Sequence, residues 1–494
     1  MNLLIKHGKL RTLRSLAVGL LAGGLVASGG LLGVNPAQAT HPTDAQDALE
    51  IANAKLSREA ATQGMVLLDN AGKALPVAKG NVALFGVGAY ATVKGGTGSG
   101  DVNNRYTIDV RTGLENAGYT ITTSPTYWAA MKATVDAGLA PSTGGSFGFS
   151  AAADYSSFEE PLTAATVAPT AATDTAIYVI SRNSGEGSDR TSGKGDYLLG
   201  DKELANIKLI GKTYKNVIVV LNVGGVVDTT FYKSVNASVK DPAGNAALDS
   251  LLLMSQAGQE SGNAFADIVS GAVSPSGKLT DTWASSYSFY PASDTFATAD
   301  GISMQEDYTE GVYVGYRYFD SFYRTIYPPA PESVVNYPFG YGLSYADFTV
   351  TTTLVTADKD NVTVTANVVN TSETYAGADV VQVYFSAPTT GLDKPYQELA
   401  GYAKTSVLKA GEQQSVTIKF KTSEMSSYDA AAAAYKLEAG DYVIREGDSS
   451  RNTKVGAVLN IASTVVTEQL HNEATDQSLT NELKSDPSDF YTYA

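Results

Sequence analysis

The spacing of apolar residues changes once along this chain, and the change divides it into two folded regions. From about 50 to 285, short apolar runs at 82–85, 176–181 and 217–220 alternate with segments whose apolar residues have helical spacing. Strands of this kind, separated by helices, are typical of a mostly parallel sheet covered on both faces. We therefore expect a layered α/β/α sandwich with a mostly parallel sheet over 50–285.

In the second region, apolar residues recur at every second position. This alternation is found in three runs, at 362–368, 381–385 and 416–420. Alternating runs separated by turn residues predict an antiparallel, all-β sandwich. We place this second domain at 346–465.

Three other stretches lack a regular period. Residues 286–345 are rich in Tyr, Gly and Pro, and we expect an ordered connection that packs on both domains. Residues 140–173 are rich in Ser, Ala and Thr and are expected to form a surface insertion. Residues 466–494 are expected to form a polar tail without a structural element.

The first 39 residues have the composition of a secretory signal peptide. Four basic residues and no acidic residue precede an apolar, glycine-broken stretch at 16–34, which is followed by the small-residue pattern Ala37-Gln38-Ala39. We expect cleavage after this pattern and export of the mature chain to the cell surface or the medium. An uncleaved membrane anchor at 16–34 is the alternative, because a bilayer span needs about 20 apolar residues.

The composition excludes several kinds of chemistry. The chain of 494 residues has a net charge of −16, no cysteine and three histidines, all near its ends. An acidic chain does not fit a nucleic-acid binder, which needs a basic surface. Without cysteine there are no disulfides, thiolate metal sites or cysteine nucleophiles. So few histidines argue against a Ser-His-Asp triad or a histidine-built metal site, which leaves carboxylates as the expected catalytic groups.

A glycine-rich segment follows the apolar run at 82–85. Residues 86–91 match the dinucleotide fingerprint G-x-G-x-x-A, but nucleotide binding needs a helix N-terminus directly afterwards to hold the pyrophosphate. The chain instead continues through the glycine run at 94–100, which has no apolar period. We expect a loop there, either a flexible surface loop or one that lets the backbone approach a polar ligand such as a sugar.

A polar segment at 181–190 follows the predicted strand at 176–181. Open α/β sheets bind their ligands beyond the carboxyl ends of the strands, and Glu186 lies between two glycines, without neighbouring side chains to cover it. Asp189 and Arg190 are placed to pair with each other and fix the loop. From the spacing alone, a solvated polar loop with an incidental ion pair is the alternative.

Two further segments, 311–320 and 339–345, are rich in tyrosine and glycine. Tyrosine rings can stack on sugars, but they more often pack where two domains meet. We expect these segments to pack at the seam between the domains.

A series of motifs in a fixed order extends over both regions. They are Arg58-Glu59-Ala60-Ala61, Val66-Leu67-Leu68-Asp69-Asn70, Leu75-Pro76, the glycine run at 95–100, and the segments 184–190, 258–262, 274–279, 315–319, 338–345, 377–384 and 398–404. These motifs resemble those of glycoside hydrolase family 3, the family of many β-glucosidases and β-xylosidases. The resemblance covers about 50–465 and relates the two regions to that family's C-terminal α/β sandwich and fibronectin type III-like domain.

The resemblance implies hydrolysis of O-glycosidic bonds in β-glucosides or related sugars, with Glu186 as the general acid/base. Retaining enzymes of this kind hold two carboxyl groups about 5–5.5 Å apart, one of which attacks the sugar while the other protonates the leaving oxygen. Asp189, Arg190, Gly96 and Ser99 are expected to contribute to binding of the carbohydrate substrate. No metal or organic cofactor is implied.

One part of the family pattern is absent from the sequence. The family's nucleophile is an aspartate, typically in a Ser-Asp-Trp motif on a (β/α)₈ barrel, yet neither Trp128 nor Trp283 follows an aspartate here. Such a barrel needs about 250 residues beyond the two domains. We expect a fragment, or half of a split enzyme whose barrel lies on a separate chain. The alternative is a non-catalytic, secreted carbohydrate-binding or scaffold module, although the retained Glu186 and glycine loop favour the enzyme.

Overall fold

A computed structural model provides the coordinates. It describes residues 45–97, 102, 104–139, 153–184, 189–296, 308–324, 334–470 and 483. The helices and strands given below lie in one compact unit of the chain.

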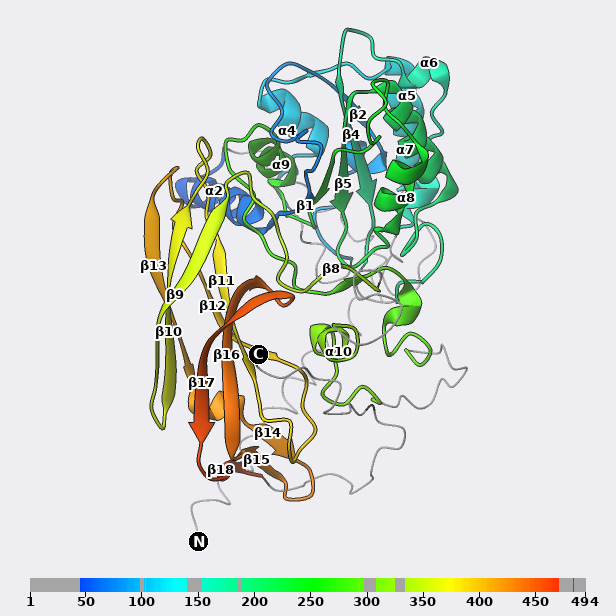
Figure 1. Cartoon of the computed structure of the whole chain (residues 1–494). Coiled ribbons are helices and arrows are strands. Elements are labelled where there is room, and N and C mark those ends of the chain that lie inside the picture. The colour runs from blue at the N-terminus through cyan, green and yellow to red at the C-terminus, as the bar shows by residue number, and fades with distance from the viewer. Residues whose placement is uncertain are drawn as a thin grey trace, which may run out of the picture. The chain divides into compact units, whose positions relative to one another are not determined.

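A six-stranded sheet forms the centre of the first domain (Figure 1). Its strands lie in the order β1-β6-β5-β4-β2-β3, and every neighbouring pair is parallel except β1 and β6. The prediction of a mostly parallel sheet is therefore confirmed. The strands are β1 (Val66–Asp69), β2 (Asn81–Phe85), β3 (Thr120–Ile121), β4 (Thr175–Ser181), β5 (Asn216–Asn222) and β6 (Ser250–Leu253).

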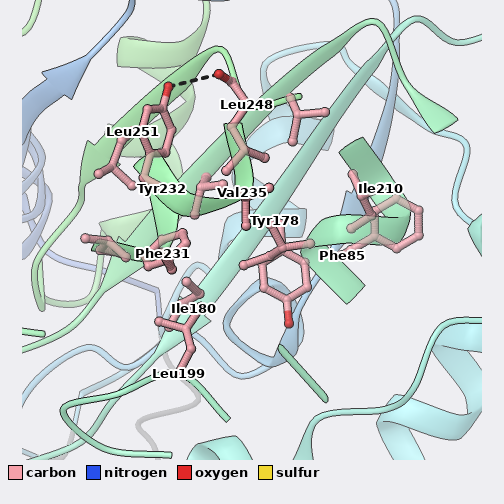
Figure 2. Close-up of a cluster of buried hydrophobic side chains, with 14 of the residues drawn as sticks. Phe85, Tyr178, Ile180, Leu199, Ile210, Phe231, Tyr232, Val235, Leu248 and Leu251 are labelled. Carbon is pink, nitrogen blue, oxygen red and sulfur yellow. Dashed lines mark hydrogen bonds between the residues drawn. The ribbon is translucent and has the colours of Figure 1, made fainter. Parts of the chain in front are cut away.

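Helices cover both faces of this sheet. Along β4, Ala176, Tyr178 and Ile180 belong to one apolar cluster, whereas Ile177 and Val179 belong to the other. Helices α5, α7 and α8 pack on the first cluster, part of which is drawn in Figure 2, and α4 and α9 pack on the second. Because both faces are buried, the strands are apolar without alternation. The helices are α2 (Ala48–Gly64), α3 (Val87–Tyr90), α4 (Val110–Asn116), α5 (Pro125–Gly138), α6 (Ala164–Val167), α7 (Asp201–Thr213), α8 (Thr230–Ser238) and α9 (Ser261–Val269).

The second domain consists of antiparallel sheets. Their strand orders are β13-β10-β9, β12-β11-β16-β17 and β14-β15-β18. In β10 every second residue is buried, and these side chains join the core between the sheets, so the predicted all-β sandwich is confirmed. The strands are β9 (Phe348–Ala357), β10 (Asn361–Asn370), β11 (Val380–Ser386), β12 (Glu398–Lys404), β13 (Gln413–Lys421), β14 (Ser427–Asp429), β15 (Ala434–Leu437), β16 (Gly440–Ser449), β17 (Asn452–Ile461) and β18 (Val465–Gln469). Strand β18 therefore extends beyond the predicted domain end at residue 465.

The described parts of the Tyr-rich connection contact both domains. Short strands β7 (Trp283–Ala284) and β8 (Val335–Tyr337) pair with each other, and α10 spans Tyr316–Phe322. Asn336 donates a hydrogen bond to Thr229 of the first domain, at 3.1 Å, while the Tyr316 hydroxyl accepts one from the Leu399 N–H, at 2.8 Å. The Tyr316 ring stacks on Phe339 with 4.4 Å between centroids. Tyr316 therefore packs where the connection meets the second domain, as expected for its segment.

The predicted surface insertion at 140–173 is wrong where the structure describes it, from residue 153 onwards. This part contains a short 3₁₀ helix (Tyr155–Phe158) and α6, and Tyr155, Phe158 and Leu162 pack against the first apolar cluster. Tyr155 and Phe158 lie three residues apart, a spacing that suits one face of a helical turn, but the small polar residues around them obscured this signal.

Among the described residues, no helix combines the length and apolar character needed to cross a bilayer. The predicted signal peptide at 1–39, and the alternative anchor at 16–34, lie outside the described residues.

Candidate active site

The loops that follow β2, β4, β5 and β6 meet at the carboxyl edge of the sheet, where one buried amide joins them. Asn222, the last residue of β5, accepts hydrogen bonds from the Val93 N–H (2.7 Å) and the Ser181 hydroxyl (2.8 Å). Its amide nitrogen donates to the carbonyls of Val93 (2.9 Å) and Ser255 (2.7 Å). Because all four bonds are buried or part-buried, Asn222 fixes the relative positions of three loops at this edge.

The segment that matched the dinucleotide fingerprint forms the short helix α3. Its first N–H groups are already bonded within the protein: Gly86 donates to the Tyr127 hydroxyl (3.0 Å) and Val87 to the Glu159 carboxylate (2.9 Å). A carboxylate occupies the position where a pyrophosphate would need free N–H groups. A Cβ atom at Gly88 would lie 2.4 Å from the Ser181 hydroxyl oxygen. The glycines therefore allow α3 to pack closely on β4, and nucleotide binding is not supported.

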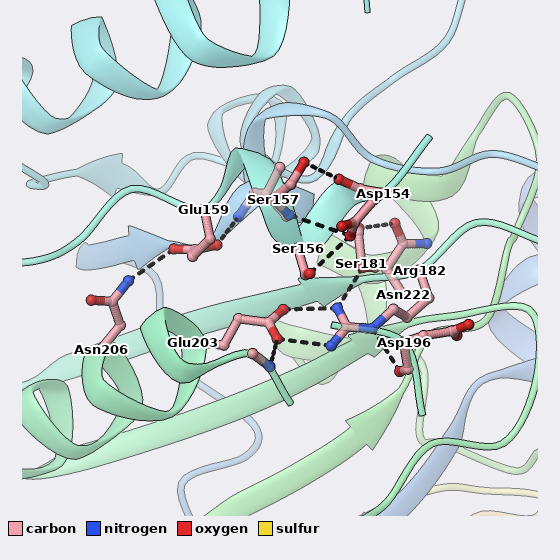
Figure 3. A network of polar contacts seen from close by, with 12 residues as sticks. Asp154, Ser156, Ser157, Glu159, Ser181, Arg182, Asp196, Glu203, Asn206 and Asn222 are labelled. Carbon is pink, nitrogen blue, oxygen red and sulfur yellow. Dashed lines mark hydrogen bonds and ion pairs between the residues drawn. The ribbon is translucent and has the colours of Figure 1, made fainter. Parts of the chain in front are cut away.

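The loop at 182–196 begins on a buried ion pair (Figure 3). Arg182 donates two hydrogen bonds to the Glu203 carboxylate, both at 2.7 Å, and the two residues are 3% and 0% exposed. Arg182 also donates to the carbonyl of Asp196 at 2.8 Å, and Glu203 accepts from the Gly200 N–H at 2.7 Å. Burial acts to lower the pKa of Arg182, but the bonds and charge of Glu203 outweigh it and raise this pKa. The first arm of the loop is therefore held by a guanidinium whose three nitrogens all donate hydrogen bonds.

A second buried carboxylate, Glu159, lies beside this pair. It accepts hydrogen bonds from the Val87 N–H and from the Asn206 amide at 3.0 Å. Burial, followed by the negative charge of Glu203, raises the pKa of Glu159 to about 7. The sequence placed Glu159 in a surface insertion, so its role in joining α3 to α7 was missed.

The second arm of the loop is held by another ion pair. The Arg190 Nε lies 2.6 Å from the Asp196 carboxylate, and Arg190 Nη1 donates to the carbonyl of Val226 at 2.9 Å. The expected pairing of Asp189 with Arg190 is therefore wrong. Asp196 is the better partner, because its carboxylate also accepts the Thr191 N–H and so holds the turn with two bonds.

Both arms of the loop line a cavity of about 230 Å³. Residues 182–184 and 189–191 contribute to its wall, together with 153–155 and 194–196. Of the predicted site residues, Asp189 and Arg190 lie in this wall. Gly96 is described, in a non-helical loop, but is not among the lining residues. Glu186 and Ser99 lie outside the described residues, so the structure places only the residues on either side of Glu186.

Known protein families match both domains. Residues 65–316 match the glycosyl hydrolase family 3 C-terminal domain, and residues 379–450 match the fibronectin type III-like domain. Beta-glucosidase A of Butyrivibrio fibrisolvens is 36% identical over 483 residues, covering 87% of this chain and 54% of the relative. A beta-glucosidase of Ruminococcus albus is 35% identical over 302 residues, covering 60% of this chain and 29% of the relative.

Solved structures of beta-glucosidases are also similar to this chain. The beta-glucosidase from Paenibacillus barengoltzii is similar with a TM-score of 0.72 and 32% identity, covering 85% of this chain and 45% of that one. Beta-glucosidase 3B from Thermotoga neapolitana, in complex with glucose, has a TM-score of 0.72 and 32% identity, covering 86% of this chain and 56% of that one. The chain thus spans about half the length of these proteins or less. It belongs to glycosyl hydrolase family 3, with that family's C-terminal α/β domain followed by a fibronectin type III-like domain.

Proposed function

We propose that this chain supplies the general acid/base of a retaining β-glucosidase-type hydrolase, and that Glu186 is that residue. One observation carries the proposal: the two arms on either side of Glu186 are fixed by ion pairs at the carboxyl edge of the sheet and line one cavity. Ligands bind at this edge in open α/β sheets. The anchored arms suit a loop that must present one carboxyl group reproducibly to a substrate.

In the proposed reaction, Glu186 donates its proton to the glycosidic oxygen while a second carboxylate attacks the anomeric carbon. The bond to the leaving group breaks, and a glycosyl–enzyme intermediate forms. Glu186, now deprotonated, takes a proton from the water that releases the sugar. The second carboxylate is proposed to come from the region that the relatives have outside the matched part, carried on a longer chain or on a separate one.

The test is hydrolysis of phenyl β-glucoside, whose leaving group needs a proton, by the purified chain, alone and mixed with the unmatched segment of Butyrivibrio fibrisolvens beta-glucosidase A. We expect activity only in the mixture, and its loss with Glu186→Gln. Glu373→Gln, an exposed carboxylate in the second domain, serves as the matched control and should keep full activity. Activity of the mixture that survives Glu186→Gln would contradict the proposal. Sugar binding without turnover in any mixture would instead favour the non-catalytic module.

We also propose that the chain is exported and cleaved after Ala39. The basic start, the apolar stretch and the small-residue pattern support this. Protein recovered from the medium should begin at Thr40 on N-terminal sequencing. Recovery of uncleaved chain in the membrane fraction would favour the anchor at 16–34.

A further inference from the structure

A cavity of about 200 Å³ lies between two sheets of the second domain. One wall is the start of β9, at residues 348–350. The facing wall belongs to the other sheet, where β16 turns into β17, and consists of residues 446–448, 452 and 454. Asp379, which directly precedes β11, also lines the cavity. The cavity is therefore in a different domain from the candidate active site, and the proposed reaction makes no use of it.

Three carboxylates line this cavity, and two of them have evident partners. Asp379 is 7% exposed, and one of its carboxylate oxygens lies 3.2 Å from the Lys278 Nζ. Asp448 is half-buried, and both of its carboxylate oxygens accept from the Asn452 amide at 2.9 Å. Asp379 thus has a counter-charge, and Asp448 has neutral donors.

Glu446, the third carboxylate, has no counter-charge within the described part of the chain. It is only 5% exposed, and its Oε2 accepts one hydrogen bond, from the Thr352 hydroxyl, while its Oε1 accepts none from a described residue. Lys454 stands directly opposite Glu446 in the β16–β17 register, but it is exposed and the two form no ion pair. Glutamate is rarely buried without a pair, and an unpaired buried charge is costly. We therefore expect a cation from outside the chain to meet Glu446 in the cavity.

The wall suits an ammonium ion better than a metal ion. Ca²⁺ takes six to eight oxygen ligands at about 2.3–2.6 Å, and no three acidic or histidine side chains of the described residues are grouped so that they could hold a metal. An ammonium group has three donors and no acceptor, so Glu446 Oε1 and the nearby Asp448 carboxylate match it. Charge-assisted hydrogen bonds of this kind are among the strongest in proteins.

The rest of the wall has room for the carbon atoms of such a ligand. Phe348 and Val350 lie on the strand that faces Glu446 and offer apolar contacts. The volume of about 200 Å³ is several times what one water takes up in the liquid, which is about 30 Å³. A small amine with a few carbon atoms therefore fits both the size and the chemistry of the cavity.

We propose that this cavity binds a small organic amine, whose ammonium group pairs with Glu446 and whose carbon atoms contact Phe348 and Val350. Asp448 supplies a second acceptor for the ammonium. Alkylamines and amino sugars share this chemistry, and the test distinguishes them. The proposal goes beyond the proposed function, because the site includes no residue of the 182–196 loop and binding does not require hydrolysis.

The test is saturation-transfer NMR on the full chain at neutral pH, with n-butylammonium and glucosamine as probes and 1-butanol as an uncharged analogue. We expect n-butylammonium to bind, and 1-butanol to bind at least about tenfold more weakly because the bond to a charged group is lost. Glu446→Gln keeps the shape of the side chain and should weaken the Kd of n-butylammonium by about the same factor. Tighter binding of glucosamine than of n-butylammonium would assign the cavity to amino sugars, and the reverse order to alkylamines.

Two further variants make the result specific. Asp448→Asn should weaken amine binding less than Glu446→Gln does, because Asp448 already accepts from Asn452. Glu468→Gln is the matched control, since it removes an exposed carboxylate of β18 that is not in the cavity wall, and it should leave the Kd unchanged.

Equal Kd values for wild type and Glu446→Gln would overturn the inference. Equal binding of 1-butanol and n-butylammonium would also overturn it, and this comparison needs no variant to fold. Displacement of the amine by Ca²⁺ would indicate a metal site instead. Amine binding that is seen only in Lys454→Met would contradict the inference as well, because it would show that the chain's own lysine fills the cavity.

Discussion

The anchor and the tip of the 182–196 loop differ in how their polar groups are satisfied. The anchor consists of Arg182, Asp196 and the Nε and Nη1 atoms of Arg190, all bonded within the protein, and the ion pair that Arg182 makes with Glu203 is buried. The tip consists of Asn183, Ser184, Asp189 and the Nη2 atom of Arg190. Among the described residues, Asn183 Oδ1 and Arg190 Nη2 have no hydrogen-bond partner and the Asp189 carboxylate makes no ion pair. One short loop thus separates the groups that hold it from groups that do not. The difference predicts that anchor variants lower stability, whereas tip variants leave it nearly unchanged.

The largest expected loss of stability follows removal of Glu203, the carboxylate that is bonded to Arg182 of the anchor. Glu203→Ala leaves the buried Arg182 charge without its partner, and such a loss costs about 3–5 kcal/mol of unfolding free energy. Urea unfolding, followed by tryptophan fluorescence, measures this loss of unfolding free energy. Both tryptophans, Trp128 in α5 and Trp283 in β7, lie within residues 65–316, the part matched by the family's C-terminal domain.

The matched control for this variant is an ion pair on the surface. Glu115→Ala breaks the exposed pair with Arg111 and should cost less than about 1 kcal/mol. Equal losses for Glu203→Ala and Glu115→Ala would show that the anchor pair contributes no more than a surface pair.

Stability is expected to depend on pH through Glu159, the buried carboxylate that lies beside the Arg182–Glu203 pair. Its pKa in the folded protein, about 7, lies above the ordinary value of 4.5. The folded state therefore keeps a proton that the unfolded state releases, and stability falls as pH rises from 4.5 to 7. The fall amounts to about 3 kcal/mol, at 1.36 kcal/mol for each pKa unit.

Glu159→Gln removes this contribution, since the amide cannot ionise. The difference in unfolding free energy between Glu159→Gln and wild type, measured from pH 4 to 8, should increase in favour of the variant as pH rises. A difference that stays flat over this range would mean that Glu159 is not the titrating group.

A smaller loss of stability is expected when the ion pair between Arg190 and Asp196 is removed. Asp196→Ala removes bonds to Arg190 and Thr191 that are partly exposed, so the loss of stability should be about 1 kcal/mol. The loop itself should open more often. Trypsin cleavage at Arg190 should therefore become faster in Asp196→Ala than in wild type, and unchanged cleavage would show that the pair does not hold the loop.

The smallest effect on stability is expected at the tip. Asp189 is exposed and makes no ion pair with a described residue, so Asp189→Asn should change the unfolding free energy by less than about 0.5 kcal/mol. If Asp189→Asn destabilises the protein as much as Asp196→Ala does, the distinction between anchor and tip is wrong.

Periodic features of the fold were predictable from the sequence, because burial repeats along regular elements. The apolar strands β2, β4 and β5, and the alternation in β10, are examples. Long-range polar pairs have no such period. Arg182 meets Glu203 because β4 and α7 lie side by side, and Glu159 is buried because its short helical turn packs beneath α3. The position of the loop could therefore be predicted, but not the partners that anchor it.

The most direct test of the central claim is how the effect of Glu186→Gln depends on the leaving group. Wild type and variant are each supplied with the unmatched segment of the Butyrivibrio fibrisolvens enzyme, and kcat/KM is measured on cellobiose and on dinitrophenyl β-glucoside. A general acid contributes about 10²–10⁴-fold where the leaving group needs a proton. We predict a loss of that size on cellobiose and a far smaller loss on the dinitrophenyl substrate. Equal losses on both substrates, or no loss on cellobiose, would contradict the assignment of Glu186 as the acid.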